Sequence, residues 1–416
     1  MKIAIIGGGS AGMISAHLIC KNHDVTVYEK DSCLGGSIKT INLNISGANI
    51  CKNIKIENGV TGFHYHSQKK FRHLIKSLDI PIRINLANVT SAIYLHHGAY
   101  FEIPSMYTLK KYGFSYYISK NLQLLKLFPG SFQAYKKIIS PENIESVQEL
   151  LMNLGQLHPV QLAWLRCSIM LAFSTPYSNT LNFPARQLAN HYKNSKVPCW
   201  WSIPSGAYSY IQRILDLNPK IKTYCNVRIK NIVRSQNKIQ IFFEDGSVNT
   251  FDKIIFACMP SEILKLLATP TDREIEYFIN WKSIQFKTTA HTDDTLYLKY
   301  KKTSKTVCDY FLKENNDYGY NTYMNHIYGL PDKIGYNFSY NLDEYIKKES
   351  IISQVIHNVP VYEHSSHKFQ KKILQLSGTN NTYYVGAYLD DGLQEGAMKT
   401  ALLASQHLNG FVKSSL

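Results

Sequence analysis

Residues 1–30 read MKIAIIGGGSAGMISAHLICKNHDVTVYEK, and this stretch decides the fold. Residues 3–6 are consecutive apolar residues, as in a buried parallel strand, and residues 11–20 have apolar spacing suited to a helix. Between them the sequence matches G-x-G-x-x-G through Gly7, Gly9 and Gly12. At a strand-to-helix turn this pattern predicts a tight turn, close approach to a pyrophosphate at the positive end of the helix dipole, and close packing of helix on strand.

A second expected strand, Asp24–Tyr28, leads directly into Glu29. A carboxylate at this place accepts hydrogen bonds from both ribose hydroxyls and repels a 2′-phosphate. The order of strand, glycine turn, helix, strand and acid therefore predicts a dinucleotide site that disfavours NADP. These residues alone leave both FAD and NAD open.

The length and the charge of the chain limit the classes of protein to which it can belong. A chain of 416 residues is expected to form two to three domains with ample core. The 46 Lys and Arg outnumber the 30 Asp and Glu, which gives a formal net charge of +16. This surplus favours a membrane surface, an acidic substrate or nucleic acid as a partner. Nucleic acid is the weakest of these, because the charge is dispersed and no recognition module appears.

The eight cysteines are scattered without a C-x-x-C pair, which indicates reduced thiols. The N-terminus leads straight into the glycine turn, without the pattern of a signal peptide. No uninterrupted apolar stretch approaches the roughly 20 residues that span a bilayer. We therefore expect a cytoplasmic protein that is soluble or peripheral to the inner face of a membrane. The sequence gives no indication of the oligomeric state.

Residues 104–140 differ in character from the rest of the chain. They contain six lysines and no acid, with eight aromatic residues from Tyr107 to Tyr135. The favoured interpretation is a solvated basic helical face over an aromatic core stripe. The alternative is a surface that meets anionic lipid, or an entrance for an amphiphilic substrate.

Strand patterns return late in the chain. A hairpin signal, EDGS, lies within residues 221–256, and residues 253–257 resemble a further parallel strand. A short strand at 382–386 then precedes a glycine turn and a helix over 395–408. The sequence predicts an α/β fold with a discontinuous Rossmann-type domain from residues 1–70, 215–275 and 375–416. A second, α+β domain is expected from residues 71–214 and 276–374.

Taken together, these segments resemble the flavin amine oxidase superfamily, in particular a bacterial group of amine-oxidase-like, predicted NAD/FAD-binding oxidoreductases. The resemblance covers essentially the whole chain. It is carried by GGGSAG with Glu29, LGGS at 34–37, IENGVTGFHYH at 56–66, CWWSIPSGAYSYIQRI at 199–214, NVRIKNI at 226–232, DKIIFACMP at 252–260 and YYVGAYLDDGLQEGAMKTAL at 383–402. The resemblance implies a glutathione-reductase-like FAD domain joined to a substrate-binding domain.

The resemblance also implies FAD rather than NAD. Simple NAD dehydrogenases do not return to the nucleotide fold at the far C-terminus, whereas FAD proteins of this kind place a late strand and helix against the flavin. NAD remains the second choice. No cysteine follows Gly386, so we expect non-covalent FAD. The implied cofactor-binding residues are Gly7, Gly9, Ser10, Ala11, Gly12, Glu29, Lys30, Gly35, Gly36, Ser37, Gly59, Val227, Gly386, Gln394, Glu395, Gly396, Ala397 and Met398.

This chain departs from many relatives beside the second glycine pair and after Gly386. Cys33 and Leu34 precede the pair and Ser37 follows it, where relatives often carry Arg or Lys, and Ala387 stands where many amine oxidases have an acid. Part of the expected cofactor contact must therefore come from other residues.

Three residues are candidates for catalysis. Relatives often set a lysine near flavin N5, and Lys287 lies in the corresponding region, although a surface lysine is the favoured interpretation. His64 and His66 follow the segment expected beside the flavin and could hydrogen-bond it or act as a base. A buried structural histidine is the competing interpretation for each.

The candidate substrate pocket is aromatic. Trp200 and Trp201 could form its wall together with Tyr388, and core packing is an equal alternative. Glu57 is comparable with the acid that relatives place near the flavin. No metal site is expected, because His364 and His367 have no carboxylate or cysteine beside them in the sequence.

We therefore expect an FAD-dependent oxidoreductase that transfers hydride to flavin from a C–H or C–N bond of a small apolar or lipid-like substrate. An acidic head group is favoured, because a protein of charge +16 repels cations at long range. One alternative is a flavin-dependent isomerase of fatty acids or polyenes. Another is a non-catalytic FAD-binding interaction protein, because fold alone does not select among these.

Overall fold

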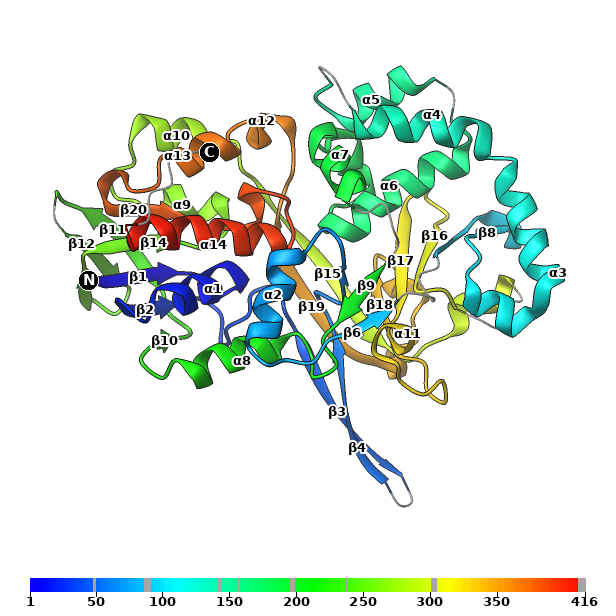
Figure 1. Cartoon of the computed structure of the whole chain (residues 1–416), viewed down its shortest axis with the longest axis horizontal. Helices are drawn as coiled ribbons and strands as arrows, with labels where there is room; N and C mark the ends of the chain where they lie inside the picture. Colours follow the sequence, from blue (N-terminus) through cyan, green and yellow to red (C-terminus); the bar gives the residue numbers. More distant parts are fainter. Residues whose placement is uncertain are drawn as a thin grey trace.

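The computed structural model describes residues 1–47, 50–85, 91–140, 144–155, 157–194, 199–236, 238–300 and 305–410. The last six residues of the expected nucleotide domain, 411–416, lie outside the described residues. Figure 1 shows two lobes side by side: one holds strand β1 (Lys2–Ile6) and helix α14 (Gln394–Leu408), and helix α3 (Met106–Leu125) lies at the far end of the other.

A parallel sheet forms the centre of the first lobe. Its strand order is β10 (Lys222–Tyr224), β2 (Asp24–Tyr28), β1, β14 (Lys253–Phe256) and β20 (Thr382–Tyr384), and all four neighbouring pairs are parallel. The strands come from the beginning, the middle and the end of the chain. The expected α/β fold is confirmed.

Both faces of this sheet are covered, because successive residues of each strand point to opposite sides. Ile3 and Ile5 face a cluster that includes residues of α1 (Ser10–Ile19), α14, α2 (Lys69–Ser77) and α8 (Tyr208–Leu217). Ala4 and Ile6 face the opposite cluster, with residues of strands β11 (Ile229–Arg234), β12 (Ile239–Phe243) and β13 (Val248–Phe251) and of helices α9 (Pro260–Leu266), α10 (Asp272–Phe278) and α13 (Gln370–Gln375). The domain boundaries expected from the sequence put most of α2 and α8 in the second domain. In the structure both helices pack in the core cluster on one face of the parallel sheet.

The second lobe is built on a seven-stranded sheet. Its order is β19 (Ile351–Pro360), β15 (Ser283–His291), β18 (Asn337–Tyr340), β17 (Tyr318–Tyr323), β16 (Cys308–Leu312), β7 (Ser91–Tyr94) and β8 (Tyr100–Glu102). The pair β16–β7 is parallel and the other pairs are antiparallel. The helices of this lobe are α3, α4 (Phe128–Ile139), α5 (Val147–Leu154), α6 (Pro159–Phe173), α7 (Ala185–Asn194) and α11 (Met324–Tyr328).

Smaller elements join the lobes. The hairpin β3 (Thr40–Gly47) and β4 (Ile50–Glu57) projects from the body (Figure 1), and a three-stranded sheet has the order β5 (Phe63–His64), β9 (Trp200–Ser202) and β6 (Arg83–Asn85). The remaining short helices are α12 (His364–His367), η1 (His96–Gly98), η2 (Tyr177–Asn182), η3 (Thr295–Tyr300), η4 (Asp343–Tyr345), η5 (Lys348–Ser350), η6 (Thr379–Asn381) and η7 (Ala387–Leu389). Across the described ranges, none of the helices has both the length and the apolar character needed to cross a bilayer.

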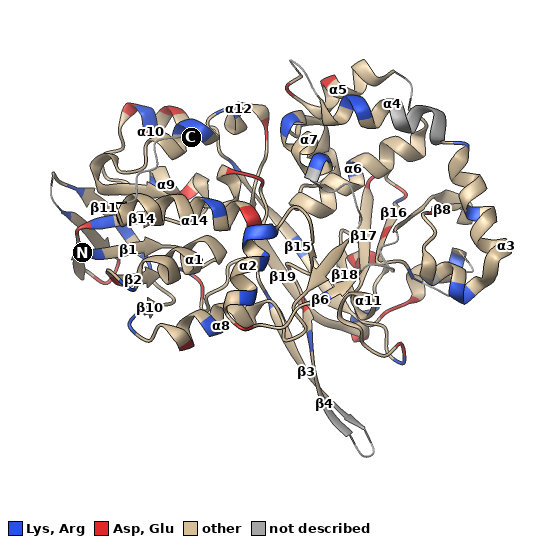
Figure 2. Cartoon of the chain, in the orientation of Figure 1, with Lys and Arg blue, Asp and Glu red and all other residues tan. Residues whose placement is uncertain are grey.

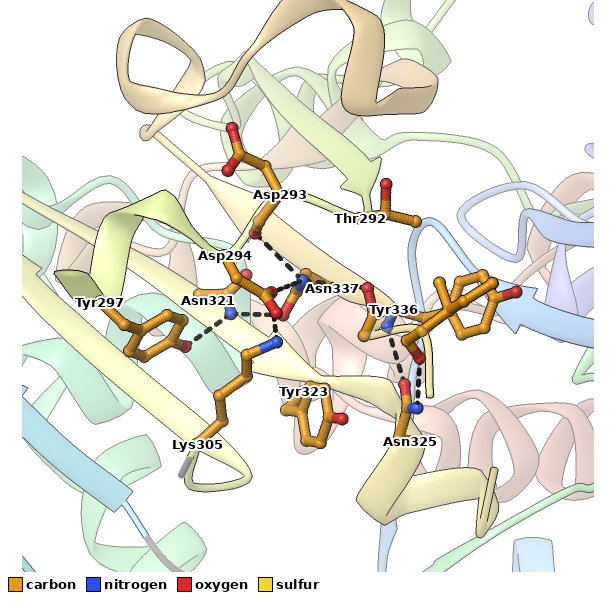
Figure 3. Close-up of polar contacts among 12 residues, drawn as sticks. Thr292, Asp293, Asp294, Tyr297, Lys305, Asn321, Tyr323, Asn325, Tyr336 and Asn337 are labelled. Carbon is orange, nitrogen blue, oxygen red and sulfur yellow. Dashed lines mark hydrogen bonds and ion pairs between the residues drawn. The ribbon is translucent and has the colours of Figure 1, made fainter. Parts of the chain in front are cut away.

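A buried polar network holds the second sheet to η3 (Figure 3). The amide of Asn321 donates to the hydroxyl of Tyr297 at 2.8 Å and to Oδ1 of Asn337 at 2.9 Å. Asn337 in turn donates to Asp294, which forms an ion pair with Lys305. Because Tyr297, Asn321 and Asn337 are buried and the members of the network, with exposed Asp294, satisfy one another, we assign it to stability rather than to a ligand site.

Candidate functional site

The glycine turn after β1 creates a cradle. A Cβ on Gly12 would lie 2.0 Å from the carbonyl oxygen of Gly7, and Gly7 itself has φ +107°, so side chains are excluded at both positions. Gly9 is different: a Cβ there would meet only the Cα of Gly36, at 3.7 Å. Apart from this ordinary van der Waals contact and its chain neighbours, no described atom lies within 4 Å of that position, so backbone can approach a ligand there.

The start of helix α1 provides donors at this cradle. Within the described residues, no side chain caps the helix, and its first turn, Ser10 to Gly12, carries no acid. The amides of this turn and the positive end of the helix dipole therefore suit the negative charge of a pyrophosphate. The residues present fit this part of FAD.

Glu29 lies buried at the end of β2, only 6% exposed. Its Oε2 accepts a hydrogen bond from the amide of Gly8 at 2.7 Å, and its Oε1 accepts one from the amide of Asp31 at 2.9 Å. These two bonds orient the carboxylate and leave lone pairs for a ribose diol. The amide of Val227 donates to the carbonyl of Glu29 at 3.0 Å, which places Val227 beside the same site. Lys30, the next residue after Glu29, is exposed.

The second glycine pair docks on the first turn. The amide of Gly35 donates to the carbonyl of Gly8 at 2.8 Å. A Cβ on Gly59 would lie 2.1 Å from the carbonyl oxygen of Ser37, so the segment that begins at Glu57 packs against this loop as well. Three glycine-containing segments far apart in sequence thus meet at one place.

Tyr210, on α8, is a site residue that the sequence did not identify. Its buried hydroxyl donates to Oγ of Ser10 at 2.8 Å and lies 3.5 Å from Oε1 of Gln394. Ser10 begins α1 and Gln394 begins α14, so the two helix N-termini converge on this tyrosine. Two positive helix ends in one place suit a dinucleotide with its flavin.

The first turn of α14 is less open than expected. The carboxylate of Glu395 accepts hydrogen bonds from the amides of Lys70 and Phe71, at 3.1 and 3.0 Å, and so caps α2 instead of facing a ligand. The amide of Gly396 donates to Oδ1 of Asp391 at 2.8 Å. The side chains of Ala397 and Met398 lie in the core cluster on the α1 face of the sheet.

Gly386 and Tyr388 pack against each other. A Cβ on Gly386 would lie 2.5 Å from the Tyr388 ring, and the Gly386 amide donates to Oγ1 of Thr400 at 3.0 Å. The ring of Tyr388 is 5% exposed and lies 5.2 Å from that of Trp281, in the core on the β11–β13 face. Tyr388 therefore belongs to the core, and its placement does not support the expected role in a pocket wall.

The structure separates the two tryptophans. Trp201 has no exposed surface and packs between Phe63 and Phe71, at 4.5 and 5.8 Å between ring centroids. Trp200 is partly exposed and lies 6.1 Å from the ring of His64, its neighbour across β5 and β9. Strand alternation explains this difference, because adjacent residues of β9 point to opposite faces.

His64 is buried and His66 is exposed. The Nδ1 of His64 accepts a hydrogen bond from the amide of Ser67 at 3.3 Å. In the neutral ring the proton then lies on Nε2. Burial, with His64 nearby, lowers the pKa of His191 on α7 to about 4.

Lys287 lies on the outer side of β15. Its side chain is 44% exposed, and its Nζ is 3.5 Å from Oδ1 of Asp343. The next residue, Thr288, points the opposite way, and its hydroxyl lies 3.0 Å from Nε2 of His357 and 3.4 Å from the carbonyl of Asn58. The strand register therefore places Thr288, not Lys287, beside the segment expected at the flavin.

His357, on β19, is the second residue that the sequence did not identify. Its Nε2 lies 2.9 Å from the carbonyl oxygen of Asn58, and burial lowers its pKa. Because a carbonyl only accepts, Nε2 must carry the proton and donate it. This bond holds the loop at Asn58 and Gly59 against the second sheet.

Glu57 anchors the start of α8. Its Oε1 accepts hydrogen bonds from the amide of Ala207 at 2.6 Å and from the hydroxyl of Thr40 at 2.7 Å, while Oε2 is buried without a partner among the described residues. Burial raises the pKa of Glu57 to about 7. The carboxyl group therefore keeps its proton in the folded chain well above the pH at which it ionises in the unfolded chain.

Glu57→Gln is expected to change how stability depends on pH. Since the folded pKa is raised from 4.5 to about 7, the unfolded chain ionises first, and the free energy of unfolding falls by up to about 3 kcal/mol between pH 4.5 and 7. The glutamine variant should lose this decline while keeping the acceptor for Ala207. Urea unfolding at several pH values measures it. The control Asp216→Asn replaces an exposed carboxylate on α8 and should keep the wild-type decline. If the unfolding free energy of Glu57→Gln still declined with pH as in the wild type, the assignment would be contradicted.

In the described part of the chain, no three His, Cys, Asp or Glu side chains gather as metal ligands would. His364 lies 3.2 Å from Oε1 of Glu145. Burial lowers the pKa of His367 to about 4.

The family described as "Flavin containing amine oxidoreductase" matches residues 10–283 of this chain. No curated protein matches the sequence. Among solved structures, a CLA-producing fatty acid isomerase from P. acnes has 15% identity and a TM-score of 0.64, with 97% of this chain and 98% of that chain covered. Cyclohexylamine oxidase from Brevibacterium oxydans has 11% identity and a TM-score of 0.65, covering 98% and 99%. Putrescine oxidase bound to putrescine has 11% identity and a TM-score of 0.64, covering 99% of both chains. At these identities the solved structures establish a shared fold.

Proposed function

Because the chain belongs to the family of flavin-containing amine oxidoreductases and is an FAD-dependent oxidoreductase, we propose that it takes a hydride from a C–H or C–N bond of a small apolar or lipid-like substrate with an acidic head. Bound flavin supplies the hydride acceptor. The chain's own residues bind the substrate, orient its head and keep water away.

The observation that carries this proposal is the charge of the candidate site. Two acids of the site, Glu57 and Asp391, hold their protons up to about pH 7, because burial raises the pKa of each. Oδ1 of Asp391 also accepts hydrogen bonds from the amides of Leu393 and Gly396, both at 2.8 Å. Neither acid offers the fixed negative charge that would hold a substrate ammonium.

Aromatic and amide side chains lie near Asp391, together with the ion pair of Asp390 and Lys399. A Cβ on Gly392, next to Asp391, would approach Phe173, Gln187 and Tyr362 within 2.7–3.2 Å. The ring of His64, whose Nδ1 accepts from the amide of Ser67, lies beside Trp200. The net charge of +16 favours the approach of an anion at long range. We propose that His64 orients the acidic head and that Trp200 packs along the apolar body.

The test is anaerobic reduction of the bound flavin, followed by its visible absorbance. Unsaturated fatty acids are compared with their methyl esters and with cyclohexylamine and putrescine. At low salt we expect the acids to reduce the flavin at concentrations about tenfold lower than the esters, with the difference shrinking as salt screens the charge. Reduction by the amines alone would overturn the proposal. Isomerised acid formed without an electron acceptor would instead identify an isomerase that returns the hydride to the same molecule.

The matched variants are His64→Leu and His66→Leu. We expect His64→Leu to raise the KM for the acid about tenfold and to leave the KM for the ester unchanged, because one charge-assisted hydrogen bond is lost. His66→Leu removes an exposed imidazole two residues away and should behave as wild type. Equal effects of His64→Leu on acid and ester would show that His64 does not contact the head group.

A further inference from the structure

Helix α3 carries an exposed apolar stripe. The helix is broken at Gly113, where φ is +83°. In the part that follows, Phe114 is 70% exposed, Ile118 39%, Leu122 56% and Leu125 55%. Their spacing of four, four and three residues places them on one face of the helix.

Single exposed apolar residues are ordinary, whereas a contiguous row of them marks an interaction surface. Figure 1 shows α3 at the end of the second lobe, away from α1 and the glycine cradle. The stripe is therefore separate from the candidate flavin site. The sequence left open a basic face over an aromatic core stripe and a surface that meets lipid or an amphiphilic substrate, and here four large apolar side chains of α3 face solvent.

The surroundings of the stripe are basic. Between Glu102 and Glu142 the sequence has six lysines and no acid, and Figure 2 shows blue segments and no red ones along α3. The exposed lysines are Lys110, Lys111, Lys126, Lys136 and Lys137. The same part of α3 carries Ser115, Ser119, Gln123 and Lys126 next to Ile118 and Leu122 of the stripe. Their hydroxyl, amide and ammonium groups can donate hydrogen bonds to an anionic head group.

We propose that α3 docks on an anionic lipid bilayer, with the stripe from Phe114 to Leu125 in the boundary between head groups and acyl chains and the lysines on the anionic head groups. An apolar row flanked by cations is the pattern of an interfacial helix. A second copy of this chain is a poorer occupant, because it would bring the same lysines against these ones. The proposal does not depend on the substrate proposed above.

The first test is sedimentation of the full-length flavin-loaded protein with vesicles. We expect binding to phosphatidylcholine vesicles that contain phosphatidylglycerol, about tenfold weaker binding to phosphatidylcholine alone, and release from the anionic vesicles as salt is raised. Failure to bind the anionic vesicles at low salt overturns the proposal. Binding that is equal on both vesicle types overturns the role of the lysines.

Matched double variants separate the stripe from general effects. Phe114→Ser with Leu122→Ser should weaken binding to anionic vesicles at least about tenfold. The control, Leu217→Ser with Ile279→Ser, removes two exposed apolar side chains from the first lobe, 46% and 63% exposed, and should bind as wild type. The visible flavin spectrum reports whether each variant is folded. Equal losses in both doubles, or none in the stripe double, overturn the proposal.

Charge and self-association are tested in the same way. Lys110→Ser with Lys126→Ser should weaken binding about fivefold for each lysine removed, whereas Lys220→Ser with Lys222→Ser, which lowers the net charge equally in the first lobe, should have little effect. Sedimentation velocity completes the test. A dimer that dissociates in the Phe114→Ser, Leu122→Ser variant would show that the stripe joins two copies and would overturn the lipid proposal.

Discussion

Glu274→Ala is expected to lower the free energy of unfolding by about 3–5 kcal/mol, because it leaves a buried cation without its partner. Both terminal nitrogens of Arg234, on β11, donate to the carboxylate of Glu274, on α10, at 2.6 and 2.8 Å. The two side chains are only 4–5% exposed. The hydroxyl of Tyr384, on β20, donates to the same carboxylate. The pair therefore joins helix α10, the sheet of β11, β12 and β13, and the edge of the parallel sheet. Without the carboxylate, Arg234 keeps neutral partners such as the carbonyl of Thr269 and the hydroxyl of Thr382.

Urea unfolding of the flavin-free protein measures this loss without a contribution from cofactor binding. Glu262→Ala is the matched control, because Glu262 pairs with Lys265 on neighbouring α9 at 2.9 Å, and these side chains are 35% and 68% exposed. This variant should lose no more than about 0.5 kcal/mol of unfolding free energy. The double variant Arg234→Met with Glu274→Leu should recover most of the lost stability, since it removes both charges. A loss below about 1 kcal/mol for Glu274→Ala would contradict the buried-pair assignment.

The same pair makes stability sensitive to acid. Burial alone would raise the pKa of Glu274, but hydrogen bonds from Arg234 and Tyr384 outweigh it and lower the pKa to about 2. Because the folded value is depressed below 4.5, its stabilisation is complete above pH 4.5 and is lost as pH falls towards 2. This loss amounts to about 3 kcal/mol in the wild type and should be absent from Glu274→Ala.

Features that rest on local pattern were predictable from the sequence. The turn at Gly7 to Gly12, the helix after it and the carboxylate of Glu29 all lie within one strand–helix–strand unit, where apolar runs and glycines specify the geometry directly. The return of the chain in β20 was also predictable, because a short apolar strand before a glycine turn is visible without tertiary information.

Features that rest on contacts between distant residues were not predictable. Glu395 caps a helix whose first residues lie about 325 positions earlier, and no pattern near Glu395 reveals that helix end. Tyr210 looks like any apolar-face tyrosine until α8 brings its hydroxyl between two helix N-termini. Lys287 lies in the expected strand, but the register decides which of two adjacent residues faces inward, and a shift by one residue reverses the faces. The same alternation separates Trp200 from Trp201.

Gly9→Ala is expected to abolish most FAD binding while leaving the fold intact. Gly9 has φ −73°, which alanine adopts without strain, and the added methyl group would meet only the Cα of Gly36 at 3.7 Å. The methyl group therefore costs the empty protein little but fills space that a pyrophosphate needs between the two glycine loops. We expect the Kd for FAD to rise about a hundredfold, equivalent to about 3 kcal/mol.

Gly12→Ala should behave in the opposite way, because its methyl group would lie 2.0 Å from the backbone oxygen of Gly7. The flavin-free Gly12→Ala protein should lose about 3 kcal/mol or more of unfolding free energy, whereas flavin-free Gly9→Ala should stay within about 0.5 kcal/mol of wild type. Bound flavin is measured by visible absorbance and stability by urea unfolding of stripped protein. Full flavin content in Gly9→Ala would place the pyrophosphate elsewhere. Similar stability losses in both variants would mean that the open space at Gly9 serves packing rather than the cofactor.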